Sequence, residues 1–330
     1  GMEHDSFDGS DLISQSVKHD PQSPQTVAFS PELVWPQIYR NKLGFELANS
    51  FLVVASPSAR HMVDPSILAY HYSTNRVPQY VKETVFVAKS NKTISVNCRK
   101  LHPGGGIDDP NDVVKHSVAE KSPYIQGHLL ASEFTEIVSR DGWVVDEVGA
   151  FYHRYLDFLE EVLRKDDPTE RIWWVKNRSR RLDDKLPGKY FDISPQNIVI
   201  DENGSGVVID QEWELPNEVE LGFCLFRSVL LMMGSISRFG TSDNNIKYSR
   251  REFVQDTFMA ANFVLDDAHI DGYLEQEALI QTQITGKSAE HCLDWSADHL
   301  LQTKNLTSAV ADRDAMIKQL DWLLKEREKE

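Results

Sequence analysis

The sequence predicts an α+β fold, in which a small β-rich segment precedes a larger and mainly helical one. Short runs of β-branched and aromatic residues are concentrated in residues 67–101, with turn-forming residues between them. Later segments repeat apolar residues at intervals of three and four, which is the spacing of a buried helix face. A hydrophobic content of 41% and a charged content of 26% are typical of folded globular proteins.

Charge and cysteine content limit the expected partners and compartment. The chain has 330 residues and a net charge of -16, which disfavours binding to nucleic acid and to anionic membrane surfaces. We therefore expect no nucleic-acid partner. No apolar run approaches the length of a membrane span, so we expect no transmembrane segment. Three widely spaced cysteines, Cys98, Cys224 and Cys292, fit free thiols in a reducing compartment, which predicts a cytoplasmic protein.

Residues 1–66 are expected to contribute little regular structure. Residues 1–28 are rich in Ser, Asp, Gln and Pro and show no apolar periodicity, which predicts a mobile leader. Residues 29–66 form an N-terminal extension, in which the apolar phrase NSFLVVASP predicts one short buried strand.

The strands predicted in the β-rich segment cover residues 67–73, 83–89 and 93–101. The loop between the first two, TNRVPQYV, contains Arg76 but no glycine. A loop without glycine cannot bring its backbone N–H groups close to a phosphate, although an arginine can contact one. On the third strand, Cys98 and Lys100 alternate onto the same face.

A hairpin is predicted within KYFDISPQNIVIDENGSGVVIDQEWEL, residues 189–215. Two β-branched runs flank the turn sequence Asp-Glu-Asn-Gly. Asp192 and Asn197 precede the first strand and Asp210 ends the second, so we expect these three side chains to meet at one end of the hairpin. Carboxylate and amide oxygens are ligands that suit Mg²⁺.

This arrangement resembles a known family. Protein kinases and aminoglycoside-type kinases carry an Asp, four residues, an Asn, and then a strand pair ending in an Asp that holds metal. Asp192, Asn197 and Asp210 fit that frame. More narrowly, the sequence segments DISPQNI and IDQEW resemble those in the kinase-like domain of bacterial O-antigen chain-terminating enzymes. In these enzymes a methyltransferase precedes a sugar-phosphorylating kinase and a coiled coil.

The resemblance implies a protein-kinase-like fold of two lobes. Residues 67–127 would form a reduced N-terminal β lobe that binds nucleotide, and residues 128–298 a large, mainly helical C-terminal lobe. A C-terminal amphipathic helix would follow. Mg²⁺ and ATP are the cofactors that the resemblance implies.

The resemblance also gives a role to each candidate residue. The residues expected at the chemical step and at the metal are Asp192 as the catalytic residue and Asn197, Asp210 and Glu212 as metal ligands. The residues expected to bind the nucleotide are Lys100 and Arg76 at its phosphates and Tyr124, Ile125 and Gly127 at its adenine. For Lys100 two alternatives stay open, since Cys98 aligns at the same position and a solvated strand end explains the lysine equally well.

Departures from the kinase pattern leave two functions open. Residues 101–121 are too rich in Gly and Pro for the helix whose glutamate pairs with the lysine, and Glu120 is the available substitute. Tyr190 and Phe191 stand where kinases place His and Arg. The first function is transfer of the ATP γ-phosphate to a sugar or polysaccharide hydroxyl in bacterial surface-glycan synthesis. The second is a catalytically inactive kinase-like module that binds a glycan, a nucleotide or a partner enzyme.

Helices are predicted at residues 147–165, 219–233 and 253–264. The basic sequence RIWWVKNRSRR, between the first two, has two interpretations. In the first, Trp173 and Trp174 would stack on a sugar while neighbouring arginines bind phosphates. In the second, the tryptophans would form a buried pair beneath a solvated basic face.

Residues 299–330 show an interrupted three-and-four apolar spacing. This predicts either the start of a coiled coil, which would make the protein a homo-oligomer, or an amphipathic helix packed on its own domain. By the resemblance, a glycosyltransferase or methyltransferase is an expected partner and would bring the protein to the periphery of the inner membrane. Residues 29–66 would then be the remnant of a methyltransferase tail.

Overall fold

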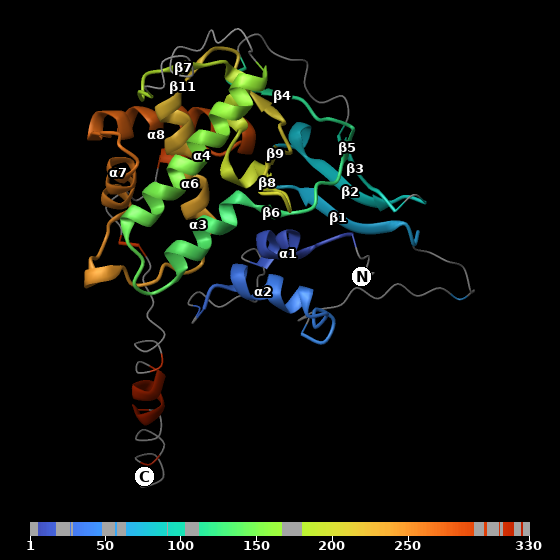
Figure 1. Ribbon diagram of the computed structural model, residues 1–330, viewed down its shortest axis with the longest axis horizontal. Coiled ribbons are helices and arrows are strands. Elements are labelled where there is room, and N and C mark those ends of the chain that lie inside the picture. The colour runs from blue at the N-terminus through green and yellow to red at the C-terminus, as the bar shows by residue number, and fades with distance from the viewer. Residues whose placement is uncertain are drawn as a thin grey trace.

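The computed structural model describes residues 6–17, 27, 29–47, 57, 64–90, 92–102, 112–166, 180–293, 300–301, 310, 313–319 and 325. Within these ranges the chain forms a mixed α+β fold, which confirms the predicted class. The four-stranded sheet lies on one side and most of the helices after it on the other (Figure 1). None of the helices in this part of the chain is long and apolar enough to cross a membrane.

The main sheet is antiparallel, with the strand order β1-β2-β3-β5. Its strands are β1 (Ile67–Ser73), β2 (Lys82–Ala88), β3 (Ile94–Lys100) and β5 (Lys121–Pro123). The first three match the predicted strands to within one residue at each end. β-branched and aromatic residues explain this agreement, because they pack well on a pleated surface.

The two faces of the main sheet differ in their surroundings. Directly paired residues lie on the same face, so the pairs Thr84↔Cys98 and Phe86↔Val96 belong to the face that also carries Lys82. We call this the inner face, since Lys82 and Thr84 are buried on it. The opposite, outer face exposes Tyr72, whose hydroxyl donates to Glu83 at 3.0 Å.

The hairpin forms as predicted, with β8 (Ile198–Ile200) paired to β9 (Gly206–Val208). β6 (His128–Leu129) adds to the other edge of β8. Two further pairs of short strands join separate segments. β4 (Lys115–His116) pairs with β10 (Trp213–Glu214), and β7 (Lys185–Leu186) pairs with β11 (Val219–Glu220). The 3-10 turns are η1 (Pro78–Tyr80), η2 (Gly188–Asp192), η3 (Pro195–Asn197) and η4 (Asp243–Asn245).

The helices after the main sheet are α3 (Leu130–Ser139), α4 (Val145–Asp166), α6 (Leu221–Gly234), α7 (Arg250–Ala260), α8 (Asp267–Thr285) and α9 (Ala289–Leu293). Three of them, α4, α6 and α7, confirm the predicted helices, although α7 begins and ends earlier than its prediction. Their apolar faces share one core that contains Trp143 and Phe253, with ring centroids 5.7 Å apart.

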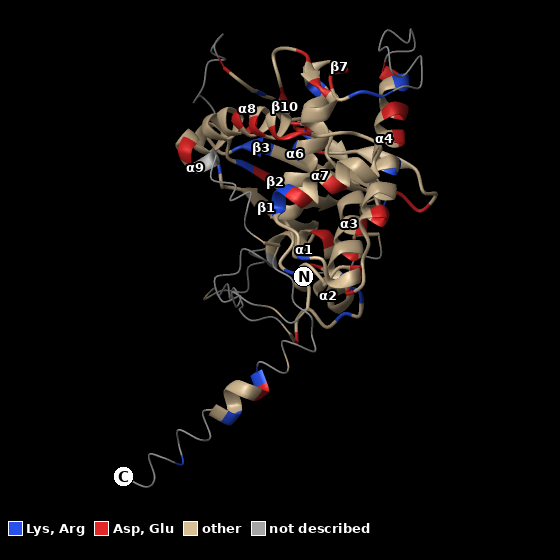
Figure 2. Ribbon diagram, turned by 90° about the vertical axis from the view of Figure 1, so that its left-hand side faces the viewer, with Lys and Arg blue, Asp and Glu red and all other residues tan. Residues whose placement is uncertain are grey.

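The N-terminal region contains two helices that were not predicted, α1 (Ser10–Val17) and α2 (Pro31–Arg40). α1 falls within the expected mobile leader, so for residues 6–17 that expectation is corrected. Contacts with other elements hold this helix. Its first residue, Ser10, is buried, and the hydroxyl of Ser14 donates to the Glu32 carbonyl oxygen of α2 at 3.0 Å. Figures 1 and 2 both place α1 and α2 below β1.

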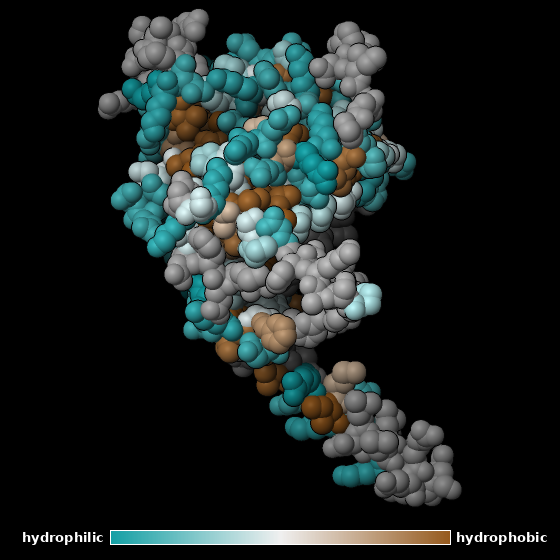
Figure 3. Space-filling model, turned by 90° about the vertical axis from the view of Figure 1, so that its right-hand side faces the viewer, coloured by the Kyte–Doolittle hydropathy of each residue, from teal (hydrophilic) through white to brown (hydrophobic). Residues whose placement is uncertain are grey.

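The described C-terminal residues, 310, 313–319 and 325, are helical and extend away from the body of the molecule (Figure 1). They expose Val310, Met316 and Ile317, and Figure 3 shows apolar and hydrophilic residues mixed along this segment. Several predictions fall outside the described residues. They concern the strand in NSFLVVASP, most of the glycine-rich segment after β3, and the tryptophans Trp173 and Trp174.

Two glycines test the helix packing. A Cβ on Gly149 of α4 would lie 2.6 Å from the Cβ of Ala260, whereas a Cβ on exposed Gly272 of α8 would meet nothing within 4 Å. We expect Gly149→Ala to lower the free energy of unfolding by about 1–3 kcal/mol through overpacking. Gly272→Ala should raise it by about 0.5–1 kcal/mol through helix propensity. Urea denaturation of both variants measures this, and equal effects would contradict the α4–α7 contact.

Candidate functional site

A buried lysine connects the main sheet to the end of the hairpin. Lys82 begins β2 with its side chain 2% exposed, and its Nζ donates to Asp210 Oδ1 and lies 3.0 Å from Glu212 Oε2. Burial lowers the pKa of this ammonium, but the charges of Asp210 and Glu212 outweigh burial and hold the pKa above its usual value. Lys82 is therefore a fixed positive charge at neutral pH.

Glu212 receives three cationic or ring donors. Besides Lys82, Arg76 Nη2 lies 3.0 Å from Oε1 and His116 Nε2 lies 3.1 Å from Oε2. Burial raises the pKa of Glu212, but the hydrogen bond from His116 and the charges of Lys82 and Arg76 outweigh it, so the pKa lies well below its usual value. Glu212 is thus ionised and anchors the cations around it.

Aromatic rings enclose this network. The His116 ring lies 5.1 Å from that of Tyr80 and 4.3 Å from that of Trp213, and the Arg76 guanidinium lies 5.3 Å from the Trp213 centroid. Gln283 of α8 donates to the Tyr80 hydroxyl at 2.8 Å. Such a water-poor setting strengthens the interactions between the enclosed charges.

Asp192 lies next to this network and has different partners. Its side chain is 5% exposed, and its Oδ2 accepts the backbone N–H of Glu212 at 3.1 Å and of Trp213 at 3.3 Å. Its Oδ1 lies 4.0 Å from Arg227 Nη1. Burial raises the pKa of Asp192 to about 7 although Arg227 and the Glu212 N–H lower it, and the charges of Glu212 and Asp210 add to the rise.

Asp210 is the accessible member of the site. Its carboxylate is 49% exposed, and its backbone φ of 52° lies in the left-handed region that non-glycine residues rarely adopt. Backbone strain of this kind is concentrated at functional sites. Asn197, which begins the hairpin, donates from Nδ2 to the Asp192 carbonyl oxygen at 2.9 Å, and this leaves its Oδ1 as the amide atom able to bind a cation.

Asp210 and Asn197 carry oxygens of the kind that Mg²⁺ takes from proteins. Mg²⁺ is commonly bound by one or two protein oxygens and keeps its remaining positions for water and substrate. Asp210 and Asn197 offer such oxygens, whereas Glu212 does not, because its oxygens are already paired with Lys82, Arg76 and His116. Within the described ranges, no three His, Cys, Asp or Glu side chains are grouped to hold a metal by themselves.

A lysine other than the predicted one lies beside Asp210. Lys100 is exposed at the end of β3, and its Nζ lies 3.5 Å from the carbonyl oxygen of His116. Lys82 is its direct partner on β2 and takes the place beside Asp210. Glu120, the expected partner of the lysine, is exposed, and Glu212 pairs with Lys82 instead.

The other expected nucleotide contacts lie in two segments, one after β1 and the other between β5 and β6. Arg76 points into the network and also donates to the Tyr80 carbonyl oxygen at 3.3 Å. Tyr124 follows β5, and its N–H donates to the Ile94 carbonyl oxygen at 3.1 Å. Ile125 is half-buried between β5 and β6. Gly127 passes so close to β8 that a Cβ would lie 2.1 Å from the Ile200 carbonyl oxygen.

Sequence reasoning missed Lys82, His116 and Arg227. The predicted strand began at residue 83, so one residue of boundary error removed Lys82 from the strand whose alternation places it inward. Arg227 did carry a signal, since it is the only charged residue among the 14 residues of α6 and a buried charge needs a partner. That partner is Glu277, whose Oε2 lies 3.1 Å from Arg227 Nε. His116 meets Glu212 across 96 residues, and no local pattern signals this contact.

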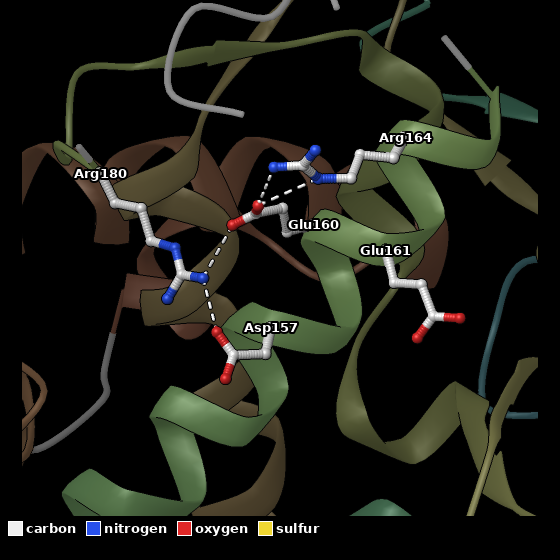
Figure 4. Close-up of a pocket in the computed structure, with 5 residues that line it drawn as sticks. All are labelled: Asp157, Glu160, Glu161, Arg164 and Arg180. Carbon is white, nitrogen blue, oxygen red and sulfur yellow. Dashed lines mark hydrogen bonds and ion pairs between the residues drawn. The ribbon is translucent and has the colours of Figure 1, made fainter. Parts of the chain in front are cut away.

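A surface hollow of about 380 Å³ lies elsewhere, along α4 (Figure 4). Its arginines are paired with carboxylates of the same hollow, and Arg180 lies 2.6 Å from Asp157 and 2.9 Å from Glu160. Arg180 was one of the arginines interpreted as phosphate contacts. Its charge is already balanced by two carboxylates, which weakens its attraction for an anion.

The pKa of Asp192 predicts a pH effect on stability. A carboxyl with a pKa of about 7 when folded and 3.8 when unfolded holds its proton only in the native state between those values, so stability falls as pH rises. The free energy of unfolding of Asp192→Asn, minus that of the unsubstituted protein, should rise by about 2–3 kcal/mol from about pH 5 to about pH 8. Urea denaturation at each pH measures this difference. The control is Asp201→Asn, because the pKa of exposed Asp201 is lowered and its effect should not change over this interval. A constant difference for Asp192→Asn would contradict its buried, protonated state.

Comparison with protein families, curated proteins and solved structures found no match to this chain. Folds and functions are separable in any case, so function is argued from the chemistry of the site.

Proposed function

We propose that this protein is a Mg²⁺-dependent, kinase-like phosphotransferase that uses ATP. The observation that carries the proposal is the pairing of Lys82 with Asp210. It sets a buried cation from the inner face of the sheet against a half-exposed carboxylate 18 residues after Asp192. Phosphoryl transfer depends on this combination of a phosphate-binding cation, metal-binding oxygens and a nearby carboxylate.

In the proposed reaction, Lys82 and Arg76 face the phosphates of the nucleotide. Both cations are held at Glu212, which sets their positions before the ligand arrives and lowers the cost of ordering them. Asn197 and Asp210 would hold Mg²⁺. The metal supplies charge neutralisation of the phosphates when it is bound. Glu212 serves here as the anchor of the cations rather than as a metal ligand.

Asp192 is the proposed acceptor of the hydroxyl proton. A catalytic base works best when its pKa is near the operating pH, and burial raises the pKa of Asp192 to about 7. Two backbone N–H groups fix its Oδ2, so Oδ1 is the oxygen available for the proton. Arg227, 4.0 Å from Oδ1, stabilises the ionised form before transfer.

One observation favours a second candidate, a kinase-like module that binds nucleotide, glycan or a partner without catalysis. Asp192 is only 4% exposed, so an acceptor hydroxyl reaches it only if neighbouring groups move. Measurement of turnover beside binding separates the two candidates. A two-lobed arrangement of the sheet and the helices, and a sugar or polysaccharide acceptor, are supported by the sequence resemblance alone.

We expect Mg²⁺ with ATP, at about 100 times its Kd, to raise the melting temperature of the protein by about 5 °C or more. Asp210→Ala should abolish the rise because it removes a metal oxygen. Lys82→Met should lose most of it, whereas Lys100→Met should keep it, since Lys100 is exposed on the neighbouring strand. No rise in the unsubstituted protein, or equal loss in both lysine variants, would count against the proposal.

Turnover is tested separately by release of ADP in the presence of candidate glycan acceptors. Asp192→Asn should keep the melting-temperature rise and lower turnover by about 100-fold or more, because it removes the base. Binding without turnover in the unsubstituted protein would favour the second candidate.

We also propose that the C-terminal helix joins copies of the chain. Val310 and Ile317 are exposed and lie seven residues apart, so they share one side of a helix. Light scattering should show a larger species that Ile317→Asp converts to the monomer mass. Gln319→Asp introduces the same charge at a neighbouring exposed position and should leave the larger species intact. A monomer mass for all three proteins would contradict this role.

A further inference from the structure

The N-terminal segment at residues 6–17 covers one end of the inner face of the sheet. Phe7 is 8% exposed and packs with its ring centroid 5.4 Å from Phe86 and 5.5 Å from Tyr124. Phe86 belongs to the same face as Lys82, as the register of β2 and β3 requires. Phe7 therefore lies on the side of the sheet where the proposed nucleotide phosphates bind, at the opposite end from Lys82.

Polar contacts hold this segment to the link between the main sheet and the helices. The Tyr124 hydroxyl donates to the Asp8 carbonyl oxygen at 3.1 Å and lies 3.2 Å from the Asp8 nitrogen. Burial raises the pKa of Tyr124 to about 12, so the hydroxyl keeps its proton at neutral pH. Asp11 of α1 is largely enclosed here as well, and burial raises its pKa to about 6 although the backbone N–H of Leu129 lowers it.

Hydrogen bonds attach α2 to Ser237, in the segment that follows α6. Glu32 is buried, and its Oε1 accepts the Ser237 N–H at 3.0 Å and the Ser237 hydroxyl. Ser14 of α1 donates to the Glu32 carbonyl oxygen at 3.0 Å, which ties the two helices together. The segment is therefore attached to α2 through Ser14 and through an ion pair of Asp8 with Arg40 at 3.3 Å, while Phe7 itself rests on aromatic packing.

We propose that residues 6–17 form an internal cover over the base end of the nucleotide site. Phe7 stands against Phe86 and Tyr124, the rings on which the planar base of a nucleotide would pack, so the base and Phe7 compete for them. This inference rests on the proposed function. Nucleotide binding displaces Phe7, while α2 remains attached through Glu32.

Isothermal titration calorimetry with Mg²⁺ and ATP tests the cover on the full chain. If the covered state predominates, the measured Kd equals the Kd of the open state divided by the fraction of molecules that are open, so it is the larger of the two. Phe7→Ala weakens the cover and should lower the Kd by about tenfold or more. The matched control is Phe29→Ala, because Phe29 lies in the same N-terminal region but is 56% exposed, and it should leave the Kd unchanged.

Hydrogen exchange on the unsubstituted protein supplies a readout that needs no variant. Saturation with Mg²⁺ and ATP should speed exchange of the amides at residues 8–17 and leave those within α4 unchanged. Slower exchange at residues 8–17 would overturn the cover.

Binding by the unsubstituted protein, with the same or a higher Kd for Phe7→Ala, would also overturn the cover while leaving the proposed function intact. A higher Kd would show that Phe7 is part of the binding wall. Absence of binding by both proteins would overturn the proposed function and this inference together.

Discussion

The site depends on one buried ammonium group, that of Lys82. Removing such a charge from water costs several kcal/mol, and only well-placed anions offset this cost. Asp210 and Glu212 provide them from the hairpin, 128 residues away in the sequence for Asp210. This requirement fixes the register of β2, because a slip of one residue would turn Lys82 to the outer face and separate its ammonium group from both carboxylates. The contact between sheet and hairpin is thus specified by charge as well as by packing.

Two carboxyl groups of the site titrate in opposite directions. Cations and His116 surround Glu212 and keep it ionised, while Asp192 is buried with Arg227 at 4.0 Å and holds its proton to about pH 7. Neighbouring acids with separated pKa values can take different roles, one as a permanent charge and the other as a group that exchanges protons. The separation arises from which partners each acid reaches, since burial acts on both in the same direction.

The sequence predicted the elements with strong local patterns and missed those fixed by distant contacts. Alternation identified β1, β2 and β3, and three-and-four spacing identified α4 and α6. α1 could not be found this way, because it is held by contacts such as that of Asp8 with Tyr124, 116 residues apart. The predicted hairpin is present, with Asp192 and Asn197 before its first strand and Asp210 shortly after its second. The sequence could not show that Lys82 rather than Lys100 meets Asp210, because the two lysines are direct partners on the same face and only contacts distant in the sequence decide which strand lies nearer to the hairpin.

The close passage of Gly127 against β8 limits what the start of β6 can carry. Any side chain there would collide with the Ile200 carbonyl oxygen, which belongs to backbone and cannot rotate away. A larger residue at this position would force β6 away from β8, and the hairpin would lose the strand that pairs with its edge.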